Sequence, residues 1–262
     1  MTAFCRAVHS ELRKLLYSRS TWIIVLLILV LQAALATVAA QQLLTIGLDA
    51  TPETCPNLIE ALPPLEYMGF DVVLFSTIPM IVLGALYGAG EFRNHSLRTT
   101  MLSTGRGVLV PLSKIFAVSL VSSALSFASI FVTISATHLT FGVQGLPFLV
   151  FNPMVWRFIL QGSIALTLLT VLASVMGFLF RTAVAPMLFL IVQVFNIGDL
   201  LASLFAIGKY LPVHLVNRLI AISERSLTQV PAQNILLLLL WILLLSVPAF
   251  LRFKTSDLRG EY

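Results

Sequence analysis

Charged residues are scarce in this chain: they make up 10% of its 262 residues, while apolar residues make up 58%. A soluble domain carries roughly a quarter charged residues, so most of this surface must meet lipid or another apolar helix. The net charge is +5, but the basic residues fall in short segments beside apolar runs, as they do in membrane proteins. The pattern predicts an all-α integral membrane protein with no nucleic-acid partner.

The common signatures of catalytic and nucleotide-binding sites are also missing. The sequence has no GxxxxGK[ST] stretch, no HExxH or GxSxG motif and no pair of carboxylates inside an apolar run. Its two cysteines, Cys5 and Cys55, fall on opposite sides of the predicted membrane, which excludes a disulfide scaffold. The four histidines lack metal-ligand spacing. We therefore expect no enzyme activity and no metal or cofactor held by this chain.

Six apolar segments predict transmembrane helices, since about 20 residues at 1.5 Å each cross a bilayer. One transmembrane domain, 1–262, contains the predicted spans 21–46, 72–90, 111–138, 158–180, 183–207 and 232–253. Residues 1–20 predict an amphipathic surface helix, and 208–231 predict a broken pair of external helices. Pro79 is expected to bend the second span. Gly84 and Gly88, spaced as in GxxxG, predict a close helix contact there.

The charges are distributed unevenly between the connections. Twelve of the sixteen Lys and Arg residues fall in the N-terminal segment, the connections after the second and fourth spans together with Lys114, and the C-terminal tail. Seven of the eleven acidic residues fall on the other side of the predicted membrane or near it. The positive-inside rule then places both termini in the cytoplasm. Residues 49–71 form an acidic, proline-rich external loop, which we interpret as a solvated loop rather than as a surface that attracts cationic peptides.

Asp199 is the one acidic residue inside a predominantly apolar region. An ionisable residue at membrane depth is a functional candidate. However, Asp199 lies about 27 Å along the helix from Arg181, which brings it to the outer interface. There it can pair with Lys209 or cap the following helix, and we favour this interpretation.

A polar stretch, residues 88–107, separates the second and third spans. It has the pattern Gly-x-Gly-Glu-aromatic-Arg-x-x-x-Leu-Arg, followed by an apolar pair, a Ser-Thr-Gly-Arg turn and a lysine, Lys114, in the next span. This pattern resembles the ABC type-2 exporter permeases, in which it forms a coupling helix that docks on a separate ATPase. The six-span layout, Glu11-x-x-Lys14 with Trp22, and the broken external element also resemble that family, especially the small bacitracin-resistance and lantibiotic-immunity permeases.

The resemblance implies a cytoplasmic coupling helix and turn at 91–107. Its ATPase contacts would be Glu91, Phe92, Arg93, Leu97, Arg98 and Met101. ATP and Mg would bind to the partner ATPase dimer, while a second permease chain, identical or homologous, would complete the route through a bacterial plasma membrane. Polar residues of the second and fifth spans are the candidates for lining that route: Ser76, Thr77, Gln193, Asn196 and, at the outer end, Asp199.

The implied function is the export of an antimicrobial peptide, a drug or another amphipathic substrate. Two alternatives stay open. One is an ion-coupled secondary transporter or channel that uses Asp199, and the other is a non-transporting sensor or scaffold subunit. For residues 88–107, the alternative is a solvated basic loop that only sets the topology.

Overall fold

The computed structural model describes residues 3–51, 53, 62–92, 109–147, 150–197, 200, 203, 206–221 and 232–259. The structure is 89% helical, and the described residues contain no strand. Five of the described helical segments are long and apolar enough to cross a membrane: Arg19–Ile46, Leu65–Ala89, Leu109–Gln144, Pro153–Phe180 and Ala232–Phe253. The predicted all-α fold is confirmed for the described residues, and the length and composition of these five helices suggest a membrane protein.

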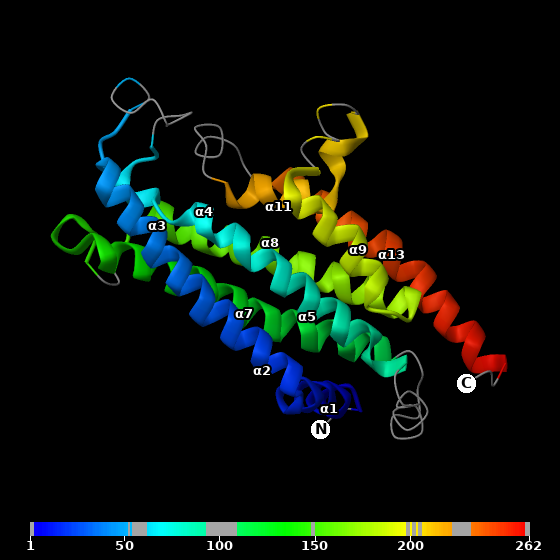
Figure 1. The fold of residues 1–262 in the computed structure, drawn as a ribbon. Coiled ribbons are helices and arrows are strands. Elements are labelled where there is room, and N and C mark those ends of the chain that lie inside the picture. The colour runs from blue at the N-terminus through cyan, green and yellow to red at the C-terminus, as the bar shows by residue number, and fades with distance from the viewer. Residues whose placement is uncertain are drawn as a thin grey trace.

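The chain begins with an amphipathic helix that is set apart from the first long helix. Helix α1 (Ala3–Tyr17) ends before Ser18, whose extended backbone leads into α2 (Arg19–Leu26). The helix continues through a π-helical turn, η1 (Leu27–Leu31), into α3 (Gln32–Ile46). Helix α1 lies at the end of the bundle, turned out of the line of α2 (Figure 1).

The second long segment is interrupted near its start. A 3-10 turn, η2 (Leu65–Tyr67), precedes α4 (Phe70–Val73), a further 3-10 turn, η3 (Leu74–Ser76), α5 (Thr77–Ala89) and η4 (Gly90–Phe92). Pro79 lacks an N–H group, and a proline ring clashes with the carbonyl four residues earlier, here that of Phe75. The α-helical hydrogen bonding therefore gives way to 3-10 geometry at Phe75.

The remaining helices are longer and more regular until α9. Helix α7 (Leu109–Phe141) passes through η5 (Gly142–Gln144) to the loop before α8 (Pro153–Phe180). The Asn152 side chain caps α8 by accepting from the Met154 amide at 3.3 Å. The last elements are α9 (Val184–Val192), the π-helical turn η6 (Gln193–Ile197), the 3-10 turn η7 (Ala206–Tyr210), α11 (Pro212–Ile220) and α13 (Ala232–Arg259).

Helix α8 is the centre of the bundle, because α5, α7, α9, α11 and α13 all pack against it. In its most apolar stretch 72% of the residues are buried, compared with 28% in Arg19–Ile46 and 11% in α13. The three stretches are similarly apolar, so the difference in burial reflects where each helix lies in the bundle. The first long helix and α13 leave most of their apolar surface available to lipid.

Two glycines let α5 approach α8 closely. A Cβ atom at Gly84 would lie 2.2 Å from the Thr170 carbonyl oxygen, and one at Gly88 would lie 2.1 Å from that of Ser174. Gly177 of α8 faces the same contact, with the Ala85 carbonyl oxygen 2.8 Å from its ideal Cβ position. Backbone packs directly on backbone here, as small residues permit in membrane helices.

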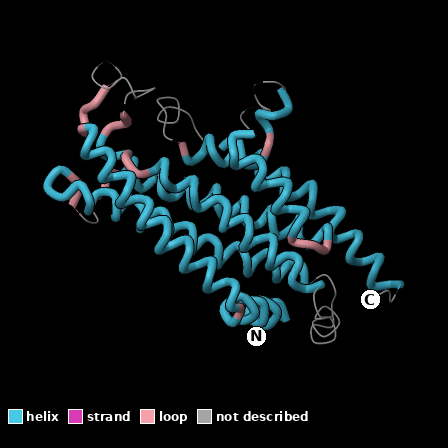
Figure 2. Tube along the Cα trace, in the orientation of Figure 1, coloured by secondary structure: helices cyan, strands magenta, loops and turns pink. Residues whose placement is uncertain are grey.

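The connections separate into two groups at the two ends of the bundle (Figures 1 and 2). Helix α1, the end of α5, the turn between α8 and α9, and the C-terminus lie toward one end, called here the α1 end. The loops after α3 and α7, together with α11, lie toward the opposite end. The two termini therefore lie toward the same end of the bundle.

One predicted span is described only in part, since residues 198–199, 201–202 and 204–205 lie outside the description. The predicted fifth span, 183–207, is represented by the apolar helix Val184–Phe195, which is shorter than the other five. Six membrane-length helices were expected, and the described residues contain five. Helix α9 loses α-geometry at Gln193 because that side chain bonds both to Phe189 and to the start of α11. The other five predicted spans lie within observed helical segments.

The predicted external pair at 208–231 is described in part. Its described residues include the end of η7 and the whole of α11, and residues 222–231 lie outside the description. Helix α11 buries its apolar face against α8 and α13. It is therefore part of the bundle rather than a helix that stands apart from it.

Candidate functional site

Helix α1 turns an apolar face toward the bundle, and that face contains one acidic residue. Ala7, Val8 and Leu15 are buried on it. Glu11 falls between them at helical spacing and is only 1% exposed. Burying a carboxylate is costly unless the group is paired and hydrogen-bonded. The residues that pair with Glu11 therefore mark a candidate functional site.

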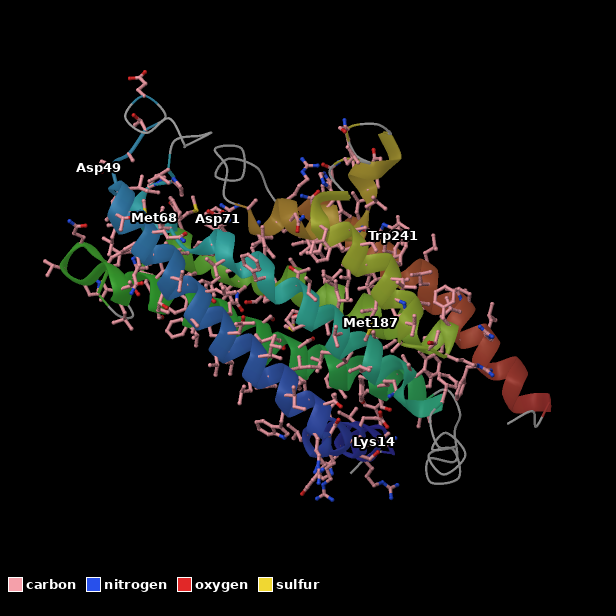
Figure 3. The ribbon with its side chains drawn as sticks, viewed as in Figure 1. Lys14, Asp49, Met68, Asp71, Met187 and Trp241 are labelled. Carbon is pink, nitrogen blue, oxygen red and sulfur yellow. The ribbon has the colours of Figure 1, made fainter. Side chains whose placement is uncertain are left out.

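Three side chains surround the Glu11 carboxylate. The Tyr87 hydroxyl, near the end of α5, donates to Oε2 at 2.7 Å. Lys114 Nζ, near the start of α7, lies 3.3 Å from the same oxygen, and Lys14 Nζ lies 2.5 Å from Oε1. One carboxylate thus joins α1, α5 and α7. Figure 3 labels Lys14 at the α1 end and Asp49 at the opposite end.

Lys114 is the most enclosed cation of this group. Its side chain is 3% exposed, whereas that of Lys14 is 39% exposed. Lys114 Nζ also donates to the Tyr87 carbonyl at 3.1 Å and lies 3.7 Å from the centre of the Tyr87 ring. Such a cation is held by a carboxylate, a carbonyl and an aromatic face together. We call Glu11, Lys14, Tyr87 and Lys114 the Glu11 cluster.

The Glu11 cluster borders the connection predicted to contact an ATPase. Tyr87 precedes the stretch 91–107 by four residues, and Lys114 follows it by seven. A second contact also connects α1 to α7: the rings of Phe4 on α1 and Phe116 on α7 pack edge to face, with their centres 5.9 Å apart. Helix α1 is therefore fixed to both helices that flank this connection.

Most of the predicted ATPase-contact residues lie outside the described residues. These are Arg93, Leu97, Arg98 and Met101, while for Glu91 only the backbone is described. Phe92 is described and points into the bundle. Its ring centre lies 5.3 Å from that of Phe178 and 5.2 Å from the guanidinium carbon of Arg181. Phe92 thus anchors the start of the connection on α8.

The polar candidates inside the membrane segments lie in different environments. Ser76 is buried and donates to the Val73 carbonyl of its own helical segment at 2.6 Å. Thr77 is fully buried, and its hydroxyl has no hydrogen-bond partner among the described residues. Asn196 is described by its backbone within η6, and Asp199 lies outside the described residues. The structure does not gather these side chains into one cluster within its described part.

Gln193, the remaining candidate, is 5% exposed and holds α11 in place. Its amide nitrogen donates to the Phe189 carbonyl at 2.8 Å, and its amide oxygen accepts from the Val213 N–H in the first turn of α11 at 3.4 Å. At the other end of α11, Gln161 of α8 donates to the Leu219 carbonyl at 2.8 Å. Two glutamines therefore satisfy backbone groups at both ends of a short buried helix.

Sequence reasoning did not identify the Glu11 cluster, although two local signals point to it. Glu11 interrupts the apolar face of a predicted amphipathic helix, and Lys114 is the only Lys, Arg, Asp or Glu in 109–141. Both are charges in positions that normally hold apolar residues, and such charges are buried only with a partner. The sequence alone does not show that Glu11 and Lys114 pair with each other.

The described residues contain no group of three His, Cys, Asp or Glu side chains placed to hold a metal ion. Comparison with known proteins adds no assignment. Neither the family models nor the curated proteins searched match this chain. The case for its function therefore rests on the sequence pattern and on the geometry of the Glu11 cluster.

Proposed function

We propose that this chain is the membrane-spanning permease subunit of an ATP-binding-cassette exporter. A separate ATPase dimer hydrolyses ATP with Mg, and the permease moves an antimicrobial peptide, drug or other amphipathic substrate outward across a bacterial plasma membrane. Two permease chains, identical or homologous, form the route. The proposal rests on the motif in 88–107 and on the chain's helical membrane character.

The observation that carries the proposal is the Glu11 cluster. An ATPase that moves residues 91–107 must pass this movement to the bundle through α5 and α7, which flank that stretch. The Glu11 carboxylate links both helices to α1 through Tyr87 and Lys114. A buried ion pair adds little net stability over apolar side chains of the same size, so a positioning role explains it better.

The proposed topology has six crossings with both termini and 91–107 in the cytoplasm. The α1 end carries Arg6, Arg13, Lys14 and Arg19, which agrees with the positive-inside rule. The sixth crossing requires α9 and the segment after it to cross together, since the helix Val184–Phe195 is short for a bilayer on its own.

The test is a mild-detergent pull-down of the tagged full-length protein from a host that carries its own neighbouring genes. We expect an ATP-binding protein to be recovered with the parent and lost with a Glu91→Ala/Arg98→Ala variant, because these charges orient the docking contact. The matched control is Asp49→Ala/Arg157→Ala, which removes one acid and one arginine at the opposite end and should recover the ATPase normally.

If no ATP-binding protein accompanies the parent, the exporter proposal fails. Transport driven by an ion gradient, with Asp199→Asn as the variant, then becomes the next measurement. If the control loses the ATPase as completely as the Glu91→Ala/Arg98→Ala variant, residues 91–107 are not its docking site.

A further inference from the structure

A cavity of about 390 Å³ lies beside the Glu11 cluster, between α1, α2, α5 and α7. This volume is within the range of small-molecule sites. The polar part of its lining is Lys14, Ser18, Ser20, Thr21, Tyr87 and Lys114. Leu15, Ile24, Leu83 and Leu86 form an apolar part. The charged side chains that line the cavity are both cations, and they share one carboxylate, that of Glu11, which is not in the lining.

The first turn of α2 opens into this cavity. Ser18 is the N-cap residue of α2, yet its side chain makes no capping hydrogen bond. The first N–H groups of an α-helix have no partner within the helix, and they carry the positive end of its dipole. Because α2 continues through η1 into α3, this end belongs to a helical segment of 28 residues. A helix start with two nearby lysines favours an anion.

Thr21 gives an independent indication of a missing ligand. Its side chain lines the cavity and is only 6% exposed. It makes no hydrogen bond to any described residue, whereas other buried hydroxyls in the helices, such as those of Ser122 and Thr133 in α7, donate to carbonyls four residues earlier. Because Thr21 lines the cavity, water or a ligand held in the cavity must supply the partner of its hydroxyl. The Thr21 hydroxyl is placed to donate to an anion at the start of α2.

We propose that this cavity binds a phosphate group, with Lys14 and Thr21 as its principal side-chain donors. Lys114, which pairs with Glu11, adds a second positive charge to the lining, and Ser18 and Ser20 complete the polar wall. The apolar wall formed by Ile24, Leu83 and Leu86 would accommodate acyl chain, so an anionic phospholipid satisfies both parts of the cavity. Helix α1 is a basic amphipathic helix, the kind that lies at a membrane surface beside such lipids.

The site is separate from the proposed transport function and does not depend on it. A phosphate here would contact α1, α2 and the Lys114 side of the Glu11 cluster at once. Its expected effect is to hold α1 against the first long helix, and therefore to stabilise the folded protein.

The test measures thermal unfolding of the full-length protein in a neutral detergent by tryptophan fluorescence. Three additions are titrated at constant ionic strength: dioleoyl phosphatidylglycerol, dioleoylglycerol, which has the same chains without phosphate, and inorganic phosphate against chloride. We expect phosphatidylglycerol to raise the Tm saturably and dioleoylglycerol to leave it unchanged. An equal, saturable rise with inorganic phosphate would identify free phosphate as the ligand source.

Three variants locate the effect. Lys14→Gln should weaken the apparent affinity about tenfold, and Thr21→Val, which keeps the side-chain shape, about threefold, as expected for loss of a charged and a neutral hydrogen bond. Arg19→Gln is the matched control, since it removes the same charge from an exposed residue outside the lining. The proposal is overturned if neither phosphate compound raises the Tm, or if Lys14→Gln and Thr21→Val bind like the parent.

Discussion

At the scale of single residues, Glu11 has an unusual combination of properties. It belongs to an amphipathic helix at the end of the bundle, yet its side chain is only 1% exposed. The carboxylate and the Lys114 ammonium are both removed from water and pair with each other, while Tyr87 and Lys14 also bond to the carboxylate. Removing one charge of a buried pair is far more costly than replacing both by apolar groups.

We therefore predict that Glu11→Gln destabilises the protein by about 3 kcal/mol, because it removes the carboxylate charge that pairs with the buried Lys114 ammonium. This corresponds to a Tm lower by roughly 6–12 °C for a chain of this size. The double variant Glu11→Gln/Lys114→Met should recover part of that loss. The measurement is the Tm of the purified protein in detergent.

Lys14 provides the comparison at the same carboxylate. Its side chain is 39% exposed, and partly exposed ion pairs contribute about 0–1 kcal/mol. Lys14→Met should therefore lower the Tm much less than Glu11→Gln. Equal losses from these two variants, or a double variant that loses the sum of its two single losses, would show that the Glu11–Lys114 pair is not the buried unit.

At the scale of elements, the contact between α5 and α8 depends on the absence of side chains. Gly84 and Gly88 each place a backbone position against a carbonyl of α8. A carbonyl oxygen of a packed helix cannot turn aside as a flexible side chain can. The two helices would have to separate to admit even one methyl group, and that separation would disturb the end of α5 that carries Tyr87.

We predict that Gly84→Ala and Gly88→Ala each destabilise the protein by about 1–3 kcal/mol through overpacking, although alanine has the higher helix propensity. Gly90→Ala is the control, because a Cβ atom there meets nothing within 4 Å. It should change stability by less than about 0.5 kcal/mol, as surface substitutions usually do. The measurement is the Tm of the three variants, compared under the same conditions. If Gly84→Ala is as stable as Gly90→Ala, the close approach of α5 to α8 is wrong.

Elements differ in how far the sequence predicts them. The run Leu236–Leu240 in α13 and the uncharged stretch before Gln41 in the first long helix are local patterns, and their helices follow from length and composition. The 3-10 turn at Leu74–Ser76 follows from Pro79. These features depend on neighbours in the sequence, so they can be predicted from it.

Pairings between distant residues cannot be predicted in this way. Tyr87 is 76 residues from Glu11, and Gln161 is 58 residues from Leu219. Local patterns show that Glu11 and Lys114 require partners, but the partners depend on how the helices pack. The same holds for Gln193, which sequence reasoning places along a substrate route and which the structure uses to hold the first turn of α11.

At the scale of the whole molecule, the two ends of the bundle differ in charge and in architecture. The α1 end contains the basic amphipathic helix and the buried Glu11 cluster, while the opposite end contains the loop after α3 with Asp49 (Figure 3). The first long helix, Arg19–Ile46, joins the two ends without a charged residue between Arg19 and Asp49. Its ends should therefore lie on opposite sides of the membrane, with the more basic one inside.

The two cysteines test this orientation without new reporter residues, since Cys5 precedes the first long helix and Cys55 follows it. Cys55→Ser leaves Cys5 alone, and Cys5→Ser leaves Cys55 alone. With a membrane-impermeant maleimide on intact cells, we expect Cys55 to be labelled and Cys5 to be labelled only after the membrane is permeabilised. The double variant Cys5→Ser/Cys55→Ser is the background control. Labelling of Cys5 alone in intact cells would mean that the orientation is inverted, and equal labelling of both would place the two ends of the first long helix on one side of the membrane.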